Sequence, residues 1–189
     1  MAEHTAFFDA NVFYPAALRD FLMRLAQNAM FRARWTNRVH EEWISALLRN
    51  RPDLDRGQLE RTRRLMDNAI RNCLVEGYEE LISILTLPDP DDRHILAAAI
   101  RCRADVIVTS NLQDFPDSEL SKYKIRAQHP DEFVLGLMGR NLDLVVKTAR
   151  EQRASLKRPP KTVDEFLESL ERDDLVQVVA ELRKHRSEL

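Results

Sequence analysis

LPDPDDRHILAAAIRCRADVIVTS, residues 87–110, is the stretch that decides the fold class. Three acids, Asp89, Asp91 and Asp92, stand before a run of apolar helix formers. Aspartates in such a place predict a helix start, because they accept or complement the free N–H groups of the first turn. The β-branched run that ends at Thr109 predicts a buried strand directly after this helix. A helix that leads straight into a buried strand is typical of α/β proteins.

The neighbouring parts of the chain continue this alternation. Residues 5–8, TAFF, predict a short buried strand that a helix follows. Thr36 is placed to cap a further helix over residues 36–50, and a last strand is expected within residues 123–130. We therefore predict an α/β domain with a mostly parallel sheet over residues 1–137.

Residues 138–189 have a different pattern, which predicts an all-helical extension. Pro159 and Pro160 interrupt this part of the chain, and Thr162 can cap the helix that follows them. Apolar residues then recur at helical spacing, which favours packing on the domain; contact with a partner or a second copy of the chain is the alternative. The positions with this spacing are Phe166, Leu167, Leu170, Leu175, Val178, Val179 and Leu182.

Composition restricts the class of protein. With 44% hydrophobic and 32% charged residues the chain resembles soluble globular proteins, and no stretch approaches the ~20 apolar residues of a membrane span. The amino terminus lacks the basic and apolar regions of a signal peptide, so we expect a cytoplasmic protein with no membrane partner. The two isolated cysteines fit that compartment. We expect the five histidines at the surface or in caps, because none has a metal-ligand spacing.

The charges are segregated along the chain, although the formal net charge is only -2. Residues 32–71 hold ten arginines against six acids, whereas residues 162–174 hold six acids and one arginine. Because the planar guanidinium suits bidentate contacts with phosphate, residues 32–71 form the candidate phosphate-binding surface. A solvated helix face is the alternative, since such faces use arginine as well.

Four acidic side chains are expected to meet at one end of the sheet. In a parallel α/β sheet, ligands bind outside the carboxyl ends of the strands, where Asp9 and the loop that carries Asp114 should lie. Two helices can direct Glu42 and Asp92 to the same place. Clustered carboxylates raise one another's pKa unless a divalent cation neutralises them, so the cluster predicts Mg²⁺ or Mn²⁺. Such an ion suits the hydrolysis of phosphodiesters.

These residues carry a resemblance to the PIN-domain family. The matching blocks are FFDANVF at residues 7–13, the T-x5-E spacing from Thr36, DPDDRHILAAA at residues 89–99 and IVTSNLQDF at residues 107–115. They resemble the family's four acidic blocks in the family's order, over roughly residues 5–135. The resemblance implies a three-layer α/β/α fold and a Mg²⁺- or Mn²⁺-dependent ribonuclease, which in bacteria is most often the VapC-type toxin of a toxin-antitoxin pair.

The resemblance also implies roles for single acids. Asp9, Glu42 and Asp92 match the first three acids of the family, which act as catalytic residues by holding the metal. Asp89 corresponds to an accessory acid that some members use as a further metal ligand.

The fourth block departs from the simplest family pattern. Asn111 stands where that pattern has an aspartate, and Asp114 lies three residues further on. We therefore expect Asp114 to complete the catalytic metal site, directly or through water, with Asn111 as a polar group that orients it. Asn11 and Thr109 look like residues behind the metal ligands that orient Asp9 and metal-bound water.

The sequence therefore predicts an endoribonuclease that acts as the toxin of a type II toxin-antitoxin module. Its expected partners are a single-stranded or loop RNA substrate, with residues 32–71 as the RNA-binding surface, and a cognate antitoxin; a homodimer is an open alternative. A catalytically silent PIN-like module that binds RNA or protein is the alternative function, because Asn111 replaces an acid. Asp9 could also be a helix cap, and Glu42 an ion-pair partner of Arg38.

Overall fold

The contacts of the chain group its residues into two units. The structure is a computed structural model that describes residues 4–189. The first unit, called here the sheet unit, comprises the described part of Met1–Tyr14 together with Phe31–His129. The second, the helical unit, comprises Pro15–Met30 and Pro130–Leu189. The helical unit is therefore assembled from two segments that are far apart in the sequence.

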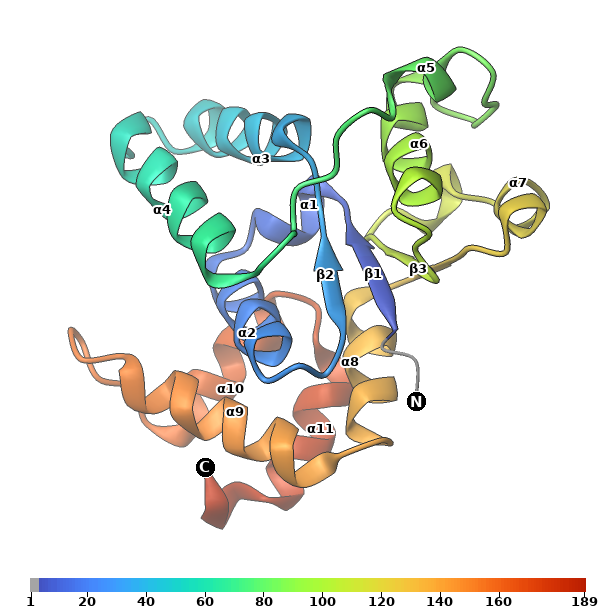
Figure 1. The fold of residues 1–189 in the computed structure, drawn as a ribbon. Helices are drawn as coiled ribbons and strands as arrows, with labels where there is room; N and C mark the ends of the chain where they lie inside the picture. Colours follow the sequence, from blue (N-terminus) through green and yellow to red (C-terminus); the bar gives the residue numbers. More distant parts are fainter. Residues whose placement is uncertain (1–3) are drawn as a thin grey trace. The chain divides into compact units, whose positions relative to one another are not determined.

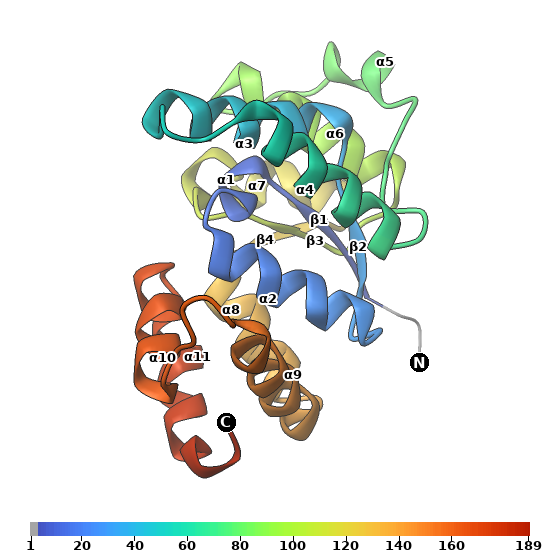
Figure 2. The same cartoon turned by 90° about the vertical axis from the view of Figure 1, so that its left-hand side faces the viewer.

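A four-stranded parallel sheet organises the sheet unit (Figures 1 and 2). The order of the strands is β2-β1-β3-β4, and Phe8 pairs with Val108 at the carboxyl ends of the two central strands. The chain proceeds from β1 to β2 on one side and from β3 to β4 on the other. Ligands of α/β sheets bind at such a reversal of strand order. The strands are β1 Thr5–Phe8, β2 Arg32–Arg34, β3 Val106–Val108 and β4 Arg126–Gln128.

The two longest helices of the sheet unit start at side-chain caps. Thr36 Oγ1 accepts the N–H of Val39 at 3.1 Å, and Asp55 caps the next helix in the same way. Val39 and Trp43 are buried on the inner side of α3, which lies beside α4 (Figure 1). The helices are α1 Ala10–Phe13, α3 Asn37–Asn50, α4 Arg56–Ala69, α5 Glu79–Ile82, α6 Arg93–Arg101 and α7 Asp117–Leu120, with 3-10 turns η1 Pro90–Asp92, η2 Leu112–Asp114 and η3 Ser121–Tyr123.

A buried polar network joins α3 to α4. The Trp43 indole N–H donates to His40 Nδ1 at 3.0 Å, so Nε2 carries the ring proton and donates to Asp67 Oδ1 at 2.9 Å. Trp35 Nε1 donates to the same oxygen at 2.9 Å. The expectation of surface or capping histidines is wrong for His40 and His94, which are 0% and 2% exposed. Each has a carboxylate partner, which compensates for burying a polar ring.

The helical unit buries the apolar positions predicted for the extension. Thr162 and Glu165 form a reciprocal capping box at the start of α10. Asp131 of α8 accepts the N–H groups of Gln177 and Val178, both at 2.9 Å, and so caps α11. The buried positions are Phe166, Leu167, Leu170, Leu175, Val178, Val179 and Leu182. The helices are α2 Ala16–Gln27, α8 Pro130–Met138, α9 Leu142–Ser155, α10 Val163–Arg172 and α11 Val176–Lys184, and the chain ends with the 3-10 turn η4 Arg186–Glu188.

The predicted α/β class, with a parallel central sheet and a helical carboxyl-terminal part, is confirmed. Strand β2 and helix α1 were not predicted. Helix α2, which the sequence placed in the α/β domain, groups by its contacts with the helical unit. The domain boundary at residue 137 stays a prediction. Within the part of the chain that is described, no helix combines the length and the apolar character needed to cross a membrane.

Candidate active site

The paired ends of β1 and β3 hold Asp9 in a fixed position. Asp9 and Thr109 each follow the last residue of their strand, and those last residues pair. The Thr109 hydroxyl donates to Asp9 Oδ2 at 2.7 Å, and Asn11 Nδ2 donates to the same oxygen at 2.6 Å. Asp9 Oδ1 accepts the N–H of Ala10 at 2.5 Å, so Asp9 also caps α1. Asn11 and Thr109 thus contact the carboxylate that they were predicted to orient.

The loop after β3 is tied to the same cluster. Asn11 Oδ1 accepts the N–H of Ser110 at 3.0 Å, and the N–H of Asn111 donates to Thr109 Oγ1 at 3.0 Å. The side-chain amide of Asn111 donates to Asp114 Oδ2. Asn111 therefore makes the contact expected of a group that orients Asp114.

Glu42 is held from two elements by one of its oxygens. His94 Nε2 of α6 lies 3.0 Å from Glu42 Oε1, and Arg38 Nε, one turn earlier on α3, donates to the same oxygen at 2.9 Å. Arg38 Nη2 also donates to the backbone carbonyl of Asp91 at 3.3 Å. The ion pair with Arg38, which was the alternative role for Glu42, is therefore present, but Glu42 Oε1 is shared with a buried histidine.

Asp89 and Asp92 behave differently at the start of α6. Asp89 Oδ1 accepts the N–H of Asp91 at 2.8 Å and so caps η1. Asp92 occupies the N-cap position of α6, yet its side chain makes no capping hydrogen bond to the described chain. Helix capping thus accounts for Asp89 but not for the half-buried Asp92 carboxylate.

The surroundings of Asp92 disfavour its charge. Burial raises the pKa of Asp92 to about 7, together with the negative charges of Asp9, Asp114 and Asp89. These four carboxyl groups come from three separate parts of the chain. Asp92 is near enough to the other three to interact with them electrostatically.

The pKa values of Asp9 and Glu42 are shifted in opposite directions. Burial raises the pKa of Asp9 above its ordinary value, despite the hydrogen bond from Thr109, and the charge of Glu42 raises it further. Burial also acts to raise the pKa of Glu42, but contacts with His94 and Arg38 outweigh it and lower that pKa. The site therefore combines one stabilised carboxylate with two that resist ionisation.

Comparison with known proteins gives the family. The family profile described as the PIN domain matches residues 5–113, which is more than half of the chain. The chain belongs to the PIN-domain family. A second profile, described as the VapC50 C-terminal domain, matches residues 130–184 of this PIN-domain protein.

One curated relative of this PIN-domain protein comes from Mycobacterium tuberculosis and bears the name "Putative ribonuclease VapC50". The two sequences are 48% identical over 68 residues, which cover 36% of this chain and 40% of the relative. The match thus spans less than half of the relative's length. No solved structure matches the chain.

The donor set of this PIN domain fits a hard divalent cation. Carboxylate oxygens of Asp9, Glu42, Asp92 and Asp114 are the ligands that Mg²⁺ and Mn²⁺ prefer. The raised pKa of Asp92 records a repulsion that a cation would relieve. Among residues 4–189, however, no three His, Cys, Asp or Glu side chains stand close enough to hold an ion as they are placed. A metal centre here stays a prediction.

The sequence did not indicate the contact of His94 with Glu42 or that of Arg38 with the Asp91 carbonyl. His94 lies two residues after Asp92, in the apolar run that starts α6. An imidazole within such a run needs a polar partner, and this was the signal that could have identified it. Arg38 was counted among the arginines of the phosphate-binding surface, but its guanidinium is engaged with Glu42.

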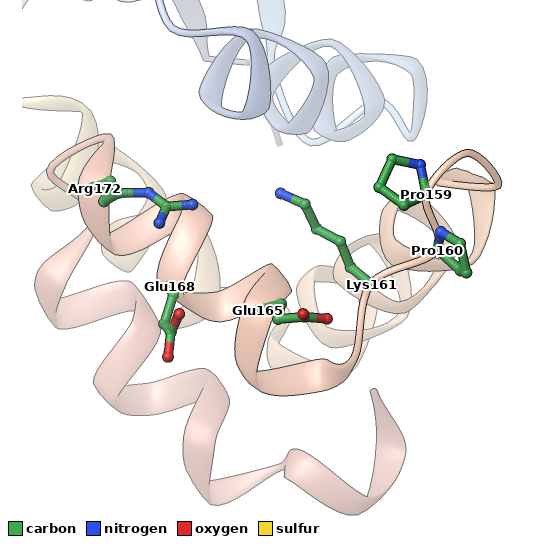
Figure 3. A pocket seen from close by; sticks show the side chains of 6 residues that line it. All are labelled: Pro159, Pro160, Lys161, Glu165, Glu168 and Arg172. Atoms are coloured by element: carbon green, nitrogen blue, oxygen red, sulfur yellow. The ribbon is translucent and has the colours of Figure 1, made fainter.

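A separate pocket of about 320 Å³ lies on the helical unit (Figure 3). In Figure 3 the side chains of Lys161 and Arg172 extend toward each other, and Glu165 and Glu168 lie below them. Glu165 is already engaged in the capping box with Thr162. The lining therefore mixes both signs of charge, and one of its acids already has a structural use.

Proposed function

We propose that this protein is a Mg²⁺- or Mn²⁺-dependent endoribonuclease that acts as the toxin of a type II toxin-antitoxin module. The observation that carries the proposal is the buried Asp9, anchored by Thr109 and Asn11, whose charge helps to raise the pKa of Asp92 to about 7. A pair of carboxyl groups that burial and mutual repulsion perturb in this way is typical of a functional site. The name of the Mycobacterium relative supports the reaction class.

Four acids would hold the cation: Asp9, Glu42, Asp92 and Asp114, with Asp89 as an outer contributor of charge. A bound divalent ion supplies an activated water and neutralises the phosphate under attack. The chain's own contribution is to fix the oxygens in advance. Asn111 restrains the Asp114 carboxylate, as Thr109 and Asn11 restrain that of Asp9.

The RNA would contact the arginines of residues 32–71 through its phosphates. Several of these side chains are already engaged: Arg38 with Glu42, Arg51 with Asp53, and Arg56 and Arg63 with Glu41. Exposed arginines that carry no such ion pair in the described chain are better candidates for phosphate contacts, namely Arg49, Arg61, Arg64 and Arg71. The antitoxin would be a separate protein that blocks the site.

The test is cleavage of a fluorescent single-stranded RNA by the purified chain with Mn²⁺. We expect cleavage that EDTA abolishes and Mn²⁺ restores, and that the double variant Asp9→Asn, Asp92→Asn lacks. Asp117→Asn is the control, since this exposed acid lies near Asp114 in the sequence and has no assigned role. Cleavage by the folded double variant at the wild-type rate would refute the proposal.

A catalytically silent PIN-like module that binds RNA or protein is the second candidate. Asn111 at the fourth acidic position favours it, as does the lack of a preassembled metal cluster within residues 4–189. This candidate predicts RNA binding without cleavage at any Mn²⁺ concentration. Co-expression with the adjacent open reading frame adds a separate test, since a toxin should become harmless when its antitoxin is present.

A further inference from the structure

The carboxylate of Glu42 is fastened asymmetrically. Both of its nitrogen partners, His94 Nε2 at 3.0 Å and Arg38 Nε at 2.9 Å, engage Oε1. Within the described residues, no hydrogen bond to Oε2 is present. The Glu42 side chain remains 35% exposed. Two fixed donors on one oxygen restrict the rotation of the carboxylate and leave the other oxygen available as a ligand.

Packing alone does not explain the imidazole of His94. The ring is 2% exposed, and its Nδ1 is buried without a hydrogen-bond partner in the described chain. A buried polar atom without a partner destabilises a fold, whereas an apolar side chain would fill the same space without that cost. The polar atom of His94 that has a partner is Nε2, and that partner is Glu42.

The geometry also links the elements that carry the acids. His94 joins α6 to α3, and Arg38 joins α3 to the carbonyl of Asp91 in η1. Asp92 lies between Asp91 and His94 in the sequence. The pair Arg38 and His94 therefore sets both the orientation of Glu42 and its placement relative to the segment of Asp92.

We propose that His94 is a positioning residue that, together with Arg38, holds Oε1 of Glu42 and so presents Oε2 to the divalent cation. This inference rests on the proposed function, because it assigns Glu42 to the metal site. It goes beyond that function by naming a histidine that contacts neither metal nor RNA and acts through Glu42 alone. Outer contacts of this kind commonly change metal affinity by 10–100-fold.

The experiment compares Mn²⁺ binding to metal-free wild type, His94→Leu and His94→Gln by calorimetry. Leucine removes the donor, whereas the glutamine amide can replace Nε2. We expect the affinity of His94→Leu for Mn²⁺ to fall by about tenfold or more, and His94→Gln to recover most of it. At limiting Mn²⁺, kcat for RNA cleavage should be highest in wild type, lower in His94→Gln and lowest in His94→Leu. KM for RNA should be unchanged. A purely structural role predicts no rescue by glutamine.

Arg38→Met provides a second route if His94→Leu does not fold. We expect weaker Mn²⁺ binding in Arg38→Met but not in Arg140→Met, which changes an exposed arginine of the helical unit. Wild-type affinity in folded His94→Leu or in Arg38→Met would overturn the positioning role and leave the proposed function standing. A wild-type chain that binds no Mn²⁺ would overturn both.

Discussion

Asp9 depends on its neighbours for the placement of both of its oxygens. Thr109 donates to Oδ2 from the end of β3, and Asn11 donates to the same atom from α1. Without these donors, a carboxyl group that is only 7% exposed would be buried without adequate partners. The same hydrogen bonds therefore serve stability and the readiness of the site.

Replacing Thr109 by valine should affect stability and activity together. The change removes the donor to Asp9 Oδ2 and the acceptor for the Asn111 N–H while it keeps the volume. We expect a loss of about 1–3 kcal/mol in the free energy of unfolding, measured with urea, because buried polar groups lose their partners. RNA cleavage should fall by about tenfold. Thr5→Val, at the opposite end of β1, is the control, and equal effects in both variants would contradict the assignment.

His40 should make stability depend on pH. Burial lowers its pKa below the ordinary 6.5, despite the neighbouring Asp67. As the pH falls, the unfolded chain therefore binds a proton at His40 before the folded chain does. The contribution of His40 to the free energy of unfolding is complete above about pH 6.5 and is lost as the pH falls below that value. We expect the wild type to lose free energy of unfolding relative to His40→Gln as the pH falls from 7.5 to 5.5. Equal slopes in the two proteins would be inconsistent with this role.

Among the elements, α6 and β3 could be predicted from sequence and β2 could not. The apolar run of residues 95–100 and the β-branched Val106–Val108 leave little choice of structure. β2 has only three residues, and its two arginines made residues 32–34 look like part of a basic surface. Burial does alternate there, since Ala33 is buried between the more exposed Arg32 and Arg34. The alternation of arginine and alanine with a period of two was the sequence signal that could have indicated this strand.

The acids of the candidate site could be named from the sequence because their order along the chain matches the family blocks. Their hydrogen bonds could not be named, since they depend on strand register. Phe8 pairs with Val108, and this pairing brings Asp9 beside Thr109. Likewise, nothing local places His94 on Glu42, which is 52 residues away in the sequence and belongs to another helix.

Helix α11 depends on an acid from α8. Asp131 is 5% exposed and accepts two backbone N–H groups at the start of α11. We expect Asp131→Ala to lower the unfolding free energy by about 1–3 kcal/mol in urea titrations, because those N–H groups lose a charged acceptor. Asp143→Asn, at an exposed position of α9, should change it by less than about 0.5 kcal/mol. Similar losses in both variants would contradict the capping role.

At the scale of the whole molecule, the near-neutral net charge conceals where RNA could bind. Arg61 and Arg64 are exposed on α4 and form no ion pair in the described residues. We expect Arg61→Gln with Arg64→Gln to weaken RNA binding and to lower the slope of log Kd against log salt by about 1.4, or ~0.7 for each lost phosphate contact. Fluorescence anisotropy with a metal-free single-stranded RNA measures both quantities.

The control for this prediction carries the same change of charge in the helical unit. Arg140→Gln with Arg150→Gln replaces two exposed arginines there. If this variant lowers the salt slope as much as the α4 variant does, the basic segment of residues 32–71 is not the RNA-binding surface.

In the proposed metal site, Asp9, Glu42, Asp92 and Asp114 share one divalent cation. The most direct measurement is anomalous diffraction from crystals of the chain soaked in Mn²⁺. We expect an anomalous peak about 2 Å from carboxylate oxygens of Asp9 and Asp92, with Glu42 contributing Oε2. Well-ordered crystals with no peak at these acids, or with manganese bound only elsewhere on the chain, would contradict it.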